Sequence, residues 1–158
     1  MTAGARPEQG LLTDGLAYLG ASIISGIPDA VIYADRDGIV RFWNAGATRI
    51  FGFSEHVTVG QSLDIIIPER LCERHWQGFY HMMETGRSRY APDQLLLVPA
   101  QTKAGEAISI EFTVAPIWNG NARLEGIAAV LRDVTVRFQE LKWLRNAAQS
   151  QPRKGTSI

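Results

Sequence analysis

The stretch from Ala30 to Ser54 reads AVIYADRDGIVRFWNAGATRIFGFS, and it decides the fold class of this 158-residue chain. It opens with two short apolar, β-branched runs on either side of Asp35-Arg36-Asp37-Gly38. Such runs around an Asp-Gly turn predict a β-hairpin. Asn44 then predicts the N-cap of a short helix that ends at Gly52. The stretch therefore indicates two antiparallel strands followed by a helix.

One longer helix and three more strands are predicted farther along the chain. Pro68 suits the first turn of a helix that runs to about Glu84 and ends at Gly86. The strand-like runs are Gln94–Val98, Ala107–Pro116 and Leu124–Arg132. Since the turns between these runs are short, antiparallel pairing is expected. The order of elements indicates an α+β domain, with a five-stranded antiparallel sheet, helices on one face and a cavity beneath the longer helix.

Two amphipathic helices are expected to flank this domain. Apolar residues recur at helical spacing in the first of them, at Leu12, Leu16, Leu19 and Ile23, and the second carries a stripe close to a heptad repeat. We divide the chain into a disordered lead (1–10), an N-terminal helix (11–25), the domain (26–133), a C-terminal helix (134–149) and a polar tail (150–158). The two stripes predict a homodimer that forms through Leu12, Leu16, Leu19 and the 134–148 helix.

Composition excludes several classes of protein. The chain has 16 Lys and Arg residues against 16 Asp and Glu residues, so neither nucleic acid nor an anionic membrane is an expected partner. Its one cysteine, Cys72, excludes an intrachain disulfide and any cysteine-based metal cage. No apolar run is long enough to cross a bilayer, and Met1–Gly10 does not have the features of a signal peptide. We expect a cytoplasmic location.

The order of the elements and several short motifs resemble the PAS sensory domain. The matching pieces are Ile27–Val31, Asp35–Val40, Phe42–Asn44, Phe51–Glu55, Val59–Gln61, Ile67–Arg70, Lys103–Gly105 and Arg132–Thr135. Together they extend over most of the chain. The resemblance implies the PAS fold, with strand order 2-1-5-4-3 and a ligand pocket under the long helix.

Within that family, the stretch PERLCERH (Pro68–His75) is similar to a helix of the haem-binding PAS domains of rhizobial oxygen-sensor kinases. In those domains the histidine binds the haem iron. The resemblance therefore implies haem b as the cofactor, His75 as the proximal iron ligand and a diatomic gas or redox state as the signal.

The same resemblance implies further residues of the haem site. The groups that hold the propionates correspond to His81 and Arg89. The distal arginine of the oxygen sensors corresponds to Leu96, so bound O₂ would need a different hydrogen-bond donor here, for which Trp118 and Arg132 are candidates.

Helical geometry provides an independent argument about His75. The residues Leu71, Cys72, His75, Phe79 and Met82 share one face of the predicted helix, and Arg74, Gln77, His81 and Glu84 lie toward the other. His75 is thus expected among apolar side chains, where Phe79 and Met82 would wall a haem pocket and a neutral imidazole can bind iron. A core histidine that hydrogen-bonds a backbone carbonyl is the alternative.

Two functions follow from these observations. The first is a haem b sensor whose output acts through a partner protein or through self-association. The alternative is a haem-free PAS module for dimerisation or interaction, with an empty pocket or a small organic ligand. Cys72 does not match the cysteine motif of flavin-binding light sensors, so we expect it to pack as a small apolar residue. Enzymatic activity is not expected, because the chain carries no nucleotide-binding, metalloprotease or nucleophile-elbow motif.

Overall fold

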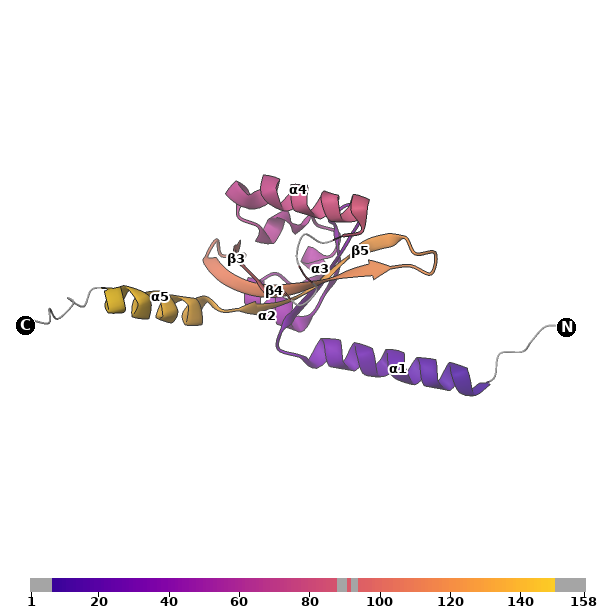
Figure 1. The fold of residues 1–158 in the computed structure, drawn as a ribbon. Coiled ribbons are helices and arrows are strands. Elements are labelled where there is room, and N and C mark those ends of the chain that lie inside the picture. The colour runs from indigo at the N-terminus through magenta and orange to yellow at the C-terminus, as the bar shows by residue number, and fades with distance from the viewer. Residues whose placement is uncertain (1–6, 88–90, 92–93, 150–158) are drawn as a thin grey trace, which may run out of the picture.

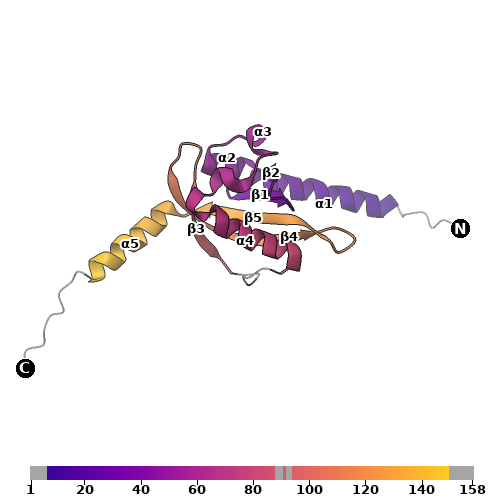
Figure 2. The ribbon, with the colours of Figure 1, turned by 90° about the horizontal axis from the view of Figure 1, so that it is seen from above.

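The structure is a computed structural model that describes residues 7–87, 91 and 94–149, with side chains from Asp14 onward (Figures 1 and 2). Its elements in chain order are α1 (Pro7–Gly26), β1 (Ala30–Asp35), β2 (Val40–Trp43), α2 (Ala45–Phe51), α3 (Glu55–Thr58), the 3₁₀ turn η1 (Leu63–Ile66), α4 (Glu69–Thr85), β3 (Leu96–Gln101), β4 (Ala107–Trp118), β5 (Leu124–Asp133) and α5 (Thr135–Gln149).

The five strands form one sheet in the order β2-β1-β5-β4-β3, and every pair is antiparallel. This confirms the predicted fold class. Ile32 lies opposite Trp43 on one side and opposite Ala129 on the other, so these three side chains share one face of the sheet. The loops after β1, β3 and β4 are too short for a crossover connection, so the strands that they join must be antiparallel.

One face of the sheet forms the core, and the short helices cover it (Figure 1). Alternate residues of β1 point into this face, and Ala30, Ile32 and Ala34 are all buried. The main cluster of buried residues consists of Ala30, Ile32, Val40, Trp43, Ala47, Phe51, Ile66, Ala100, Ile110 and Leu131. These residues come from all five strands, from α2 and from η1, so apolar contact with the sheet fixes the positions of α2 and η1.

Local sequence signals fix the ends of the helices as predicted. Asn44 is the N-cap of α2, and its side chain accepts a hydrogen bond from the Ala47 backbone N–H. Gly52 ends α2 and Gly86 ends α4, both in the left-handed conformation that glycine adopts without steric cost.

Two predicted boundaries are wrong. Helix α1 begins at Pro7, so residues 7–10 are helical and not part of a disordered lead, since proline is well tolerated in the first turn of a helix. The third strand is Leu96–Gln101 and not Gln94–Val98. It extends past Pro99 because β3 is an edge strand, where a missing N–H need not interrupt the ladder. Residues 1–6 and 150–158 lie outside the described residues.

The two terminal helices extend away from the sheet in opposite directions in both views (Figures 1 and 2). No residue of α5 is buried. Residues Leu16 and Leu19 of α1 are exposed, and the side chain of Leu12 lies outside the described residues. None of the helices formed by the described residues has the length and apolar character needed to cross a membrane.

Candidate functional site

Helix α4 lies over the core face of the sheet and carries the predicted haem ligand (Figure 1). His75 is half-buried on the inner side of the helix, and Phe79 and Met82 on the same side are buried. Arg74 and Gln77 are exposed, so the division of the helix into two faces follows the predicted spacing.

His75 is held among aromatic rings. Its imidazole lies edge-on to Trp76, with ring centroids 4.9 Å apart, and 6.0 Å from the centroid of Phe79. Burial lowers the pKa of His75, and the negative charge of Asp64 opposes this shift only in part. The imidazole is therefore neutral at pH 7, which is the form that can donate a lone pair to a metal ion.

The Nδ1 atom of His75 is buried and has no hydrogen-bond partner among the described residues. The carbonyl partner expected of an ordinary core histidine is thus missing at this atom. A buried polar atom without a partner costs about 1 to 3 kcal/mol, so native proteins rarely retain one without a reason. The imidazole offers a hydrogen-bonding or ligating position that the protein itself leaves unused.

Below α4 lies a small apolar cluster, which we call the α4 cluster. It consists of Ala34, Phe79, Met82, Met83 and Leu124, with Leu63, Trp76 and Ile127 packed against it. Met83 was not among the predicted inner residues, although it neighbours the apolar stripe at the last full turn of the helix. The cluster joins the C-terminal half of α4 to β1 and β5.

Trp76 holds the middle of α4 against the β1–β2 turn, a contact that was not predicted from the sequence. Its indole Nε1–H donates a hydrogen bond of 2.7 Å to Asp64 in η1. The indole ring also covers Gly38, where an added Cβ would lie 2.2 Å from ring atoms of Trp76. A glycine is therefore required in the turn for this contact. Through these two contacts Trp76 holds the helix that carries His75 against η1 and the β1–β2 turn.

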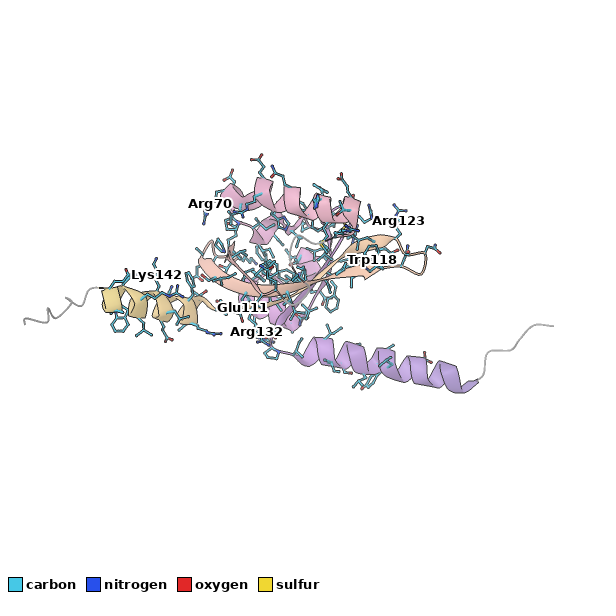
Figure 3. The ribbon with its side chains drawn as sticks, viewed as in Figure 1. Arg70, Glu111, Trp118, Arg123, Arg132 and Lys142 are labelled. Atoms are coloured by element: carbon cyan, nitrogen blue, oxygen red, sulfur yellow. The ribbon has the colours of Figure 1, made fainter. Side chains whose placement is uncertain are left out.

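A second tryptophan holds the end of the same helix. Trp118, at the end of β4, lies against Gly86, whose added Cβ would be 2.6 Å from its ring (Figure 3). Trp118 was a candidate donor to bound O₂. The structure instead places its ring at the C-cap of α4.

The remaining predicted site residues are distributed around α4. His81 is exposed and lies about 120° around the helix from His75. Leu96 is half-buried and opposite Phe112, on the core face of the sheet. Arg132 is exposed and paired with Asp29. Arg89 lies outside the described residues.

Cys72 is half-buried on α4, one turn before His75. Burial and then the charge of Asp64 raise the pKa of its thiol, which keeps the thiol protonated and unreactive at pH 7. This environment suits a packed apolar residue.

No group of three or more His, Cys, Asp or Glu side chains converges on a metal-sized space within the part of the chain that the structure describes. A single histidine is enough to hold haem from one side, because the porphyrin supplies four ligands itself.

Two of the surface clefts formed by the described residues lie away from α4. One, of about 350 Å³, is lined by the polar residues Tyr33, Asp35, Arg36, Asp37, Asn119, Arg123 and Glu125. The other, of about 370 Å³, lies beside α2, over Trp43, Asn44, Ala45, Thr48, Arg49 and Glu55.

Both terminal helices join the domain at the same end of the sheet. The buried Asn44 side chain donates to the carbonyl of Ile24 in α1 and to that of Asp29, and it accepts from the N–H of Val31. On the C-terminal side, the Thr135 hydroxyl accepts a hydrogen bond from the N–H of Ser109 in β4. Hydrogen bonds thus attach α1 to Asn44, directly after β2, and α5 to β4.

Comparison with known proteins agrees with this architecture. A family model described as PAS fold matches residues 18–134. The crystal structure of a PAS domain from Colwellia psychrerythraea superposes with a TM-score of 0.66 at 21% identity, covering 76% of this chain and 98% of that domain. This likeness concerns the fold.

Curated relatives also match this chain in sequence, and two of them are described here. An uncharacterised protein of Azorhizobium caulinodans is 32% identical over 148 residues, which is 92% of this chain and 20% of that protein. The sensor protein FixL of Bradyrhizobium diazoefficiens is 43% identical over 54 residues, which is 34% of this chain and 11% of that protein. The chain therefore spans a fifth or less of the length of these relatives.

Proposed function

The chain belongs to the PAS-fold family, and from this premise we propose that it is a sensor domain that binds haem b through His75 and responds to a diatomic gas or to redox state. The observation that carries the proposal is the neutral, half-buried imidazole with an unpartnered, buried Nδ1. When bound, haem supplies an iron that takes a diatomic ligand or changes oxidation state.

The residues around His75 fit an apolar macrocycle. Phe79, Met82 and Leu96 provide apolar walls on α4 and on the core face of the sheet. His81 and Arg89 are the groups proposed for the propionates. His81 is exposed, which suits a group at the mouth of a pocket.

Haem uptake requires α4 to separate from the sheet, since the α4 cluster fills the space beneath the C-terminal half of the helix. Trp76 and Trp118 hold α4 at its middle and its end, so their contacts with Gly38 and Gly86 must yield as the helix moves. Binding of a ligand in the pocket would thereby change the conformation of the β1–β2 turn and of the β4–β5 hairpin.

The proposed output is a change in a homodimer formed through Leu12, Leu16, Leu19 and the 134–148 helix, read by a downstream protein. Leu16, Leu19, Leu141 and Leu144 are exposed apolar side chains on the two terminal helices. Exposed apolar stripes of this kind mark protein interfaces. The chemistry needs no catalytic group, and we propose no enzymatic activity.

A second candidate is the haem-free interaction module, with an empty pocket or a small organic ligand. The close packing of Phe79, Met82 and Met83 against Ala34 and Leu124 favours it, because this packing leaves the core face covered without a cofactor. Under this function the His75 environment would be a local cost to stability and would have no role in ligation.

Absorption spectroscopy separates the two candidates. The protein, expressed with sufficient haem precursor, is measured oxidised, after dithionite and after CO, beside His75→Ala and a control variant, His56→Ala, at an exposed histidine of α3 outside the proposed haem site. The haem sensor predicts a strong Soret band that shifts on CO, is lost in His75→Ala and persists in His56→Ala. A colourless wild type that also fails to take up added haemin contradicts the haem sensor and leaves the interaction module.

A further inference from the structure

A polar cleft lies at one end of the sheet, between the β1–β2 turn and the β4–β5 hairpin. These two loops are neighbours because Asp35, the last residue of β1, lies opposite Gly126, near the start of β5. The volume of the cleft is about 350 Å³, which is at the lower end of the range for sites that bind small molecules. None of the residues that line it belongs to α4, so the cleft is separate from the proposed haem pocket.

Two guanidinium groups give one part of this cleft a positive charge. Arg36 is half-buried, and its guanidinium donates to the carbonyl of Leu124 and lies 3.5 Å from the carbonyl oxygen of Met83. Arg123 is exposed and lines the same cleft. Within the described residues, neither arginine forms an ion pair with a carboxylate. Because a carbonyl accepts a hydrogen bond without neutralising the charge, both guanidinium groups can still bind a carboxylate ligand.

Carboxylates give another part of the cleft a negative charge. Glu125 accepts a hydrogen bond of 3.0 Å from the neutral amide of Asn119. Neither Glu125 nor Asp37 forms an ion pair in the part of the chain that the structure describes. Burial, followed by the negative charges of Glu125 and Asp35, raises the pKa of Tyr33. The Tyr33 hydroxyl is therefore protonated at pH 7 and lies in a negative electrostatic potential.

Gly126 makes room for the ring of Tyr33. A Cβ added at Gly126 would lie 2.6 Å from a ring carbon of Tyr33 and 2.8 Å from its hydroxyl oxygen. The ring therefore lies across β5 and forms a wall of the cleft. An aromatic ring with carboxylates beside it suits an ammonium group, since both attract a cation.

Charges of both signs thus line the cleft without pairing with one another. Asp35 does form an ion pair, at 2.6 Å, but its partner Arg41 does not line the cleft. Phosphate would be repelled by the carboxylates, and a divalent metal ion would be repelled by the guanidinium groups. A small molecule that carries one carboxylate and one ammonium group is attracted by both parts of the cleft.

We propose that this cleft binds a free α-amino acid. Arg36 and Arg123 bind its carboxylate. Glu125, Asp37 and the ring of Tyr33 bind its ammonium group. This site goes beyond the proposed haem sensor and does not depend on it, and its ligand would be a second input to the same domain.

A titration followed by ¹H–¹⁵N NMR of the whole chain tests the proposal with three probes of matched size. L-alanine carries both charged groups, propionate lacks the ammonium group and ethylamine lacks the carboxylate. L-alanine is a sufficient probe, because the proposed contacts involve only groups that every α-amino acid shares. We expect it to shift the amide signals of Asp37, Gly38 and Glu125 with a dissociation constant on the order of 1 mM. Propionate and ethylamine should each bind at least about tenfold more weakly, because each loses one set of charged contacts.

Two exposed residues of the cleft provide the variants. Arg123→Gln and Glu125→Gln should each weaken the binding of L-alanine about five- to tenfold. Lys103→Gln and Glu106→Gln remove the same two charges from the exposed turn at the other end of β4 and should leave the binding unchanged. Amide signals that do not respond to L-alanine overturn the proposal. Equal binding of propionate or ethylamine also overturns it, as does binding of L-alanine that both cleft variants retain.

Discussion

Arg132 at the end of β5 binds both carboxylate oxygens of Asp29, with its Nε 3.0 Å from Oδ1 and 2.9 Å from Oδ2, across 103 residues of sequence. Asp29 directly precedes β1 and follows α1, while Arg132 is followed closely by α5. The ion pair therefore joins the two places where the terminal helices meet the sheet. Figure 3 shows Arg132 near the end of α1.

Removal of this pair should loosen the attachment of both helices more than it lowers the stability of the domain. For Arg132→Gln we expect a small change in Tm, because exposed ion pairs contribute little. Amide hydrogen exchange should become faster around Ile27–Asp29 and in the first turn of α5. Arg41→Gln, which removes the exposed pair with Asp35 at the opposite end of β1, is the control. Unchanged exchange at both helix junctions in Arg132→Gln would contradict the coupling.

The contact between Trp76 and Gly38 can be measured with two glycine substitutions. Gly38 and Gly60 both have positive φ, +75° and +92°, but an added Cβ meets the Trp76 ring only at Gly38 and nothing at Gly60. Gly60→Ala should cost about 1 to 2 kcal/mol from backbone strain alone. Gly38→Ala should cost about 1 to 3 kcal/mol more, because the ring must move. If the two variants lose the same free energy of unfolding in urea, the Trp76 ring moves away from an added Cβ at no cost in stability.

Asn44 should be among the most sensitive polar positions of the domain. Its buried side chain accepts from the N–H groups of Val31 and Ala47 and donates to the carbonyls of Ile24 and Asp29. Asn44→Ala removes a helix cap and leaves buried backbone groups without partners, for an expected loss of about 2 to 4 kcal/mol. Asn121→Ala, at an exposed turn, should change the free energy of unfolding by less than about 0.5 kcal/mol. Chemical denaturation of the two variants checks this difference.

The buried imidazole of His75 makes the haem-free protein sensitive to acid. Burial lowers the pKa of His75 in the folded state, whereas the unfolded chain titrates near the ordinary value of about 6.5. Below that pH the unfolded state takes up a proton that the folded state resists. This contribution to stability is therefore present above about pH 6.5 and is lost as the pH falls toward the folded pKa.

Urea unfolding at pH 5.5 and 7.5 measures the effect. His75→Gln should be less sensitive to the change of pH than the wild type, while the exposed variant His81→Gln should keep the wild-type dependence. A His75→Gln variant that loses as much stability as the wild type between the two values would show that other groups carry the acid sensitivity.

Much of the fold could be predicted because its signals are local. Each of these signals involves hydrogen bonds between residues only a few positions apart, as in the Asp35–Gly38 turn, the Asn44 cap and the helix ends at Gly52 and Gly86. The face of α4 that carries His75 also followed from spacing, since helical periodicity alone assigns side chains to faces. The end of β3 could not be predicted in this way. A strand can continue through Pro99 only at the edge of the sheet, and the sequence near Pro99 does not show which strands are neighbours.

The contacts that hold the candidate site required the tertiary structure. Nothing in the sequence near Trp76 indicates that its ring covers Gly38 or that its N–H reaches Asp64, because these residues are 38 and 12 positions away. The same is true of the unpartnered Nδ1 of His75, since whether a buried atom finds a partner depends on every element packed around it. The elements, most of their ends and the inward face of α4 could be predicted, because they depend on short-range backbone geometry. The contacts that hold α4 and the directions of α1 and α5 could not, because they depend on side chains brought together from distant parts of the chain.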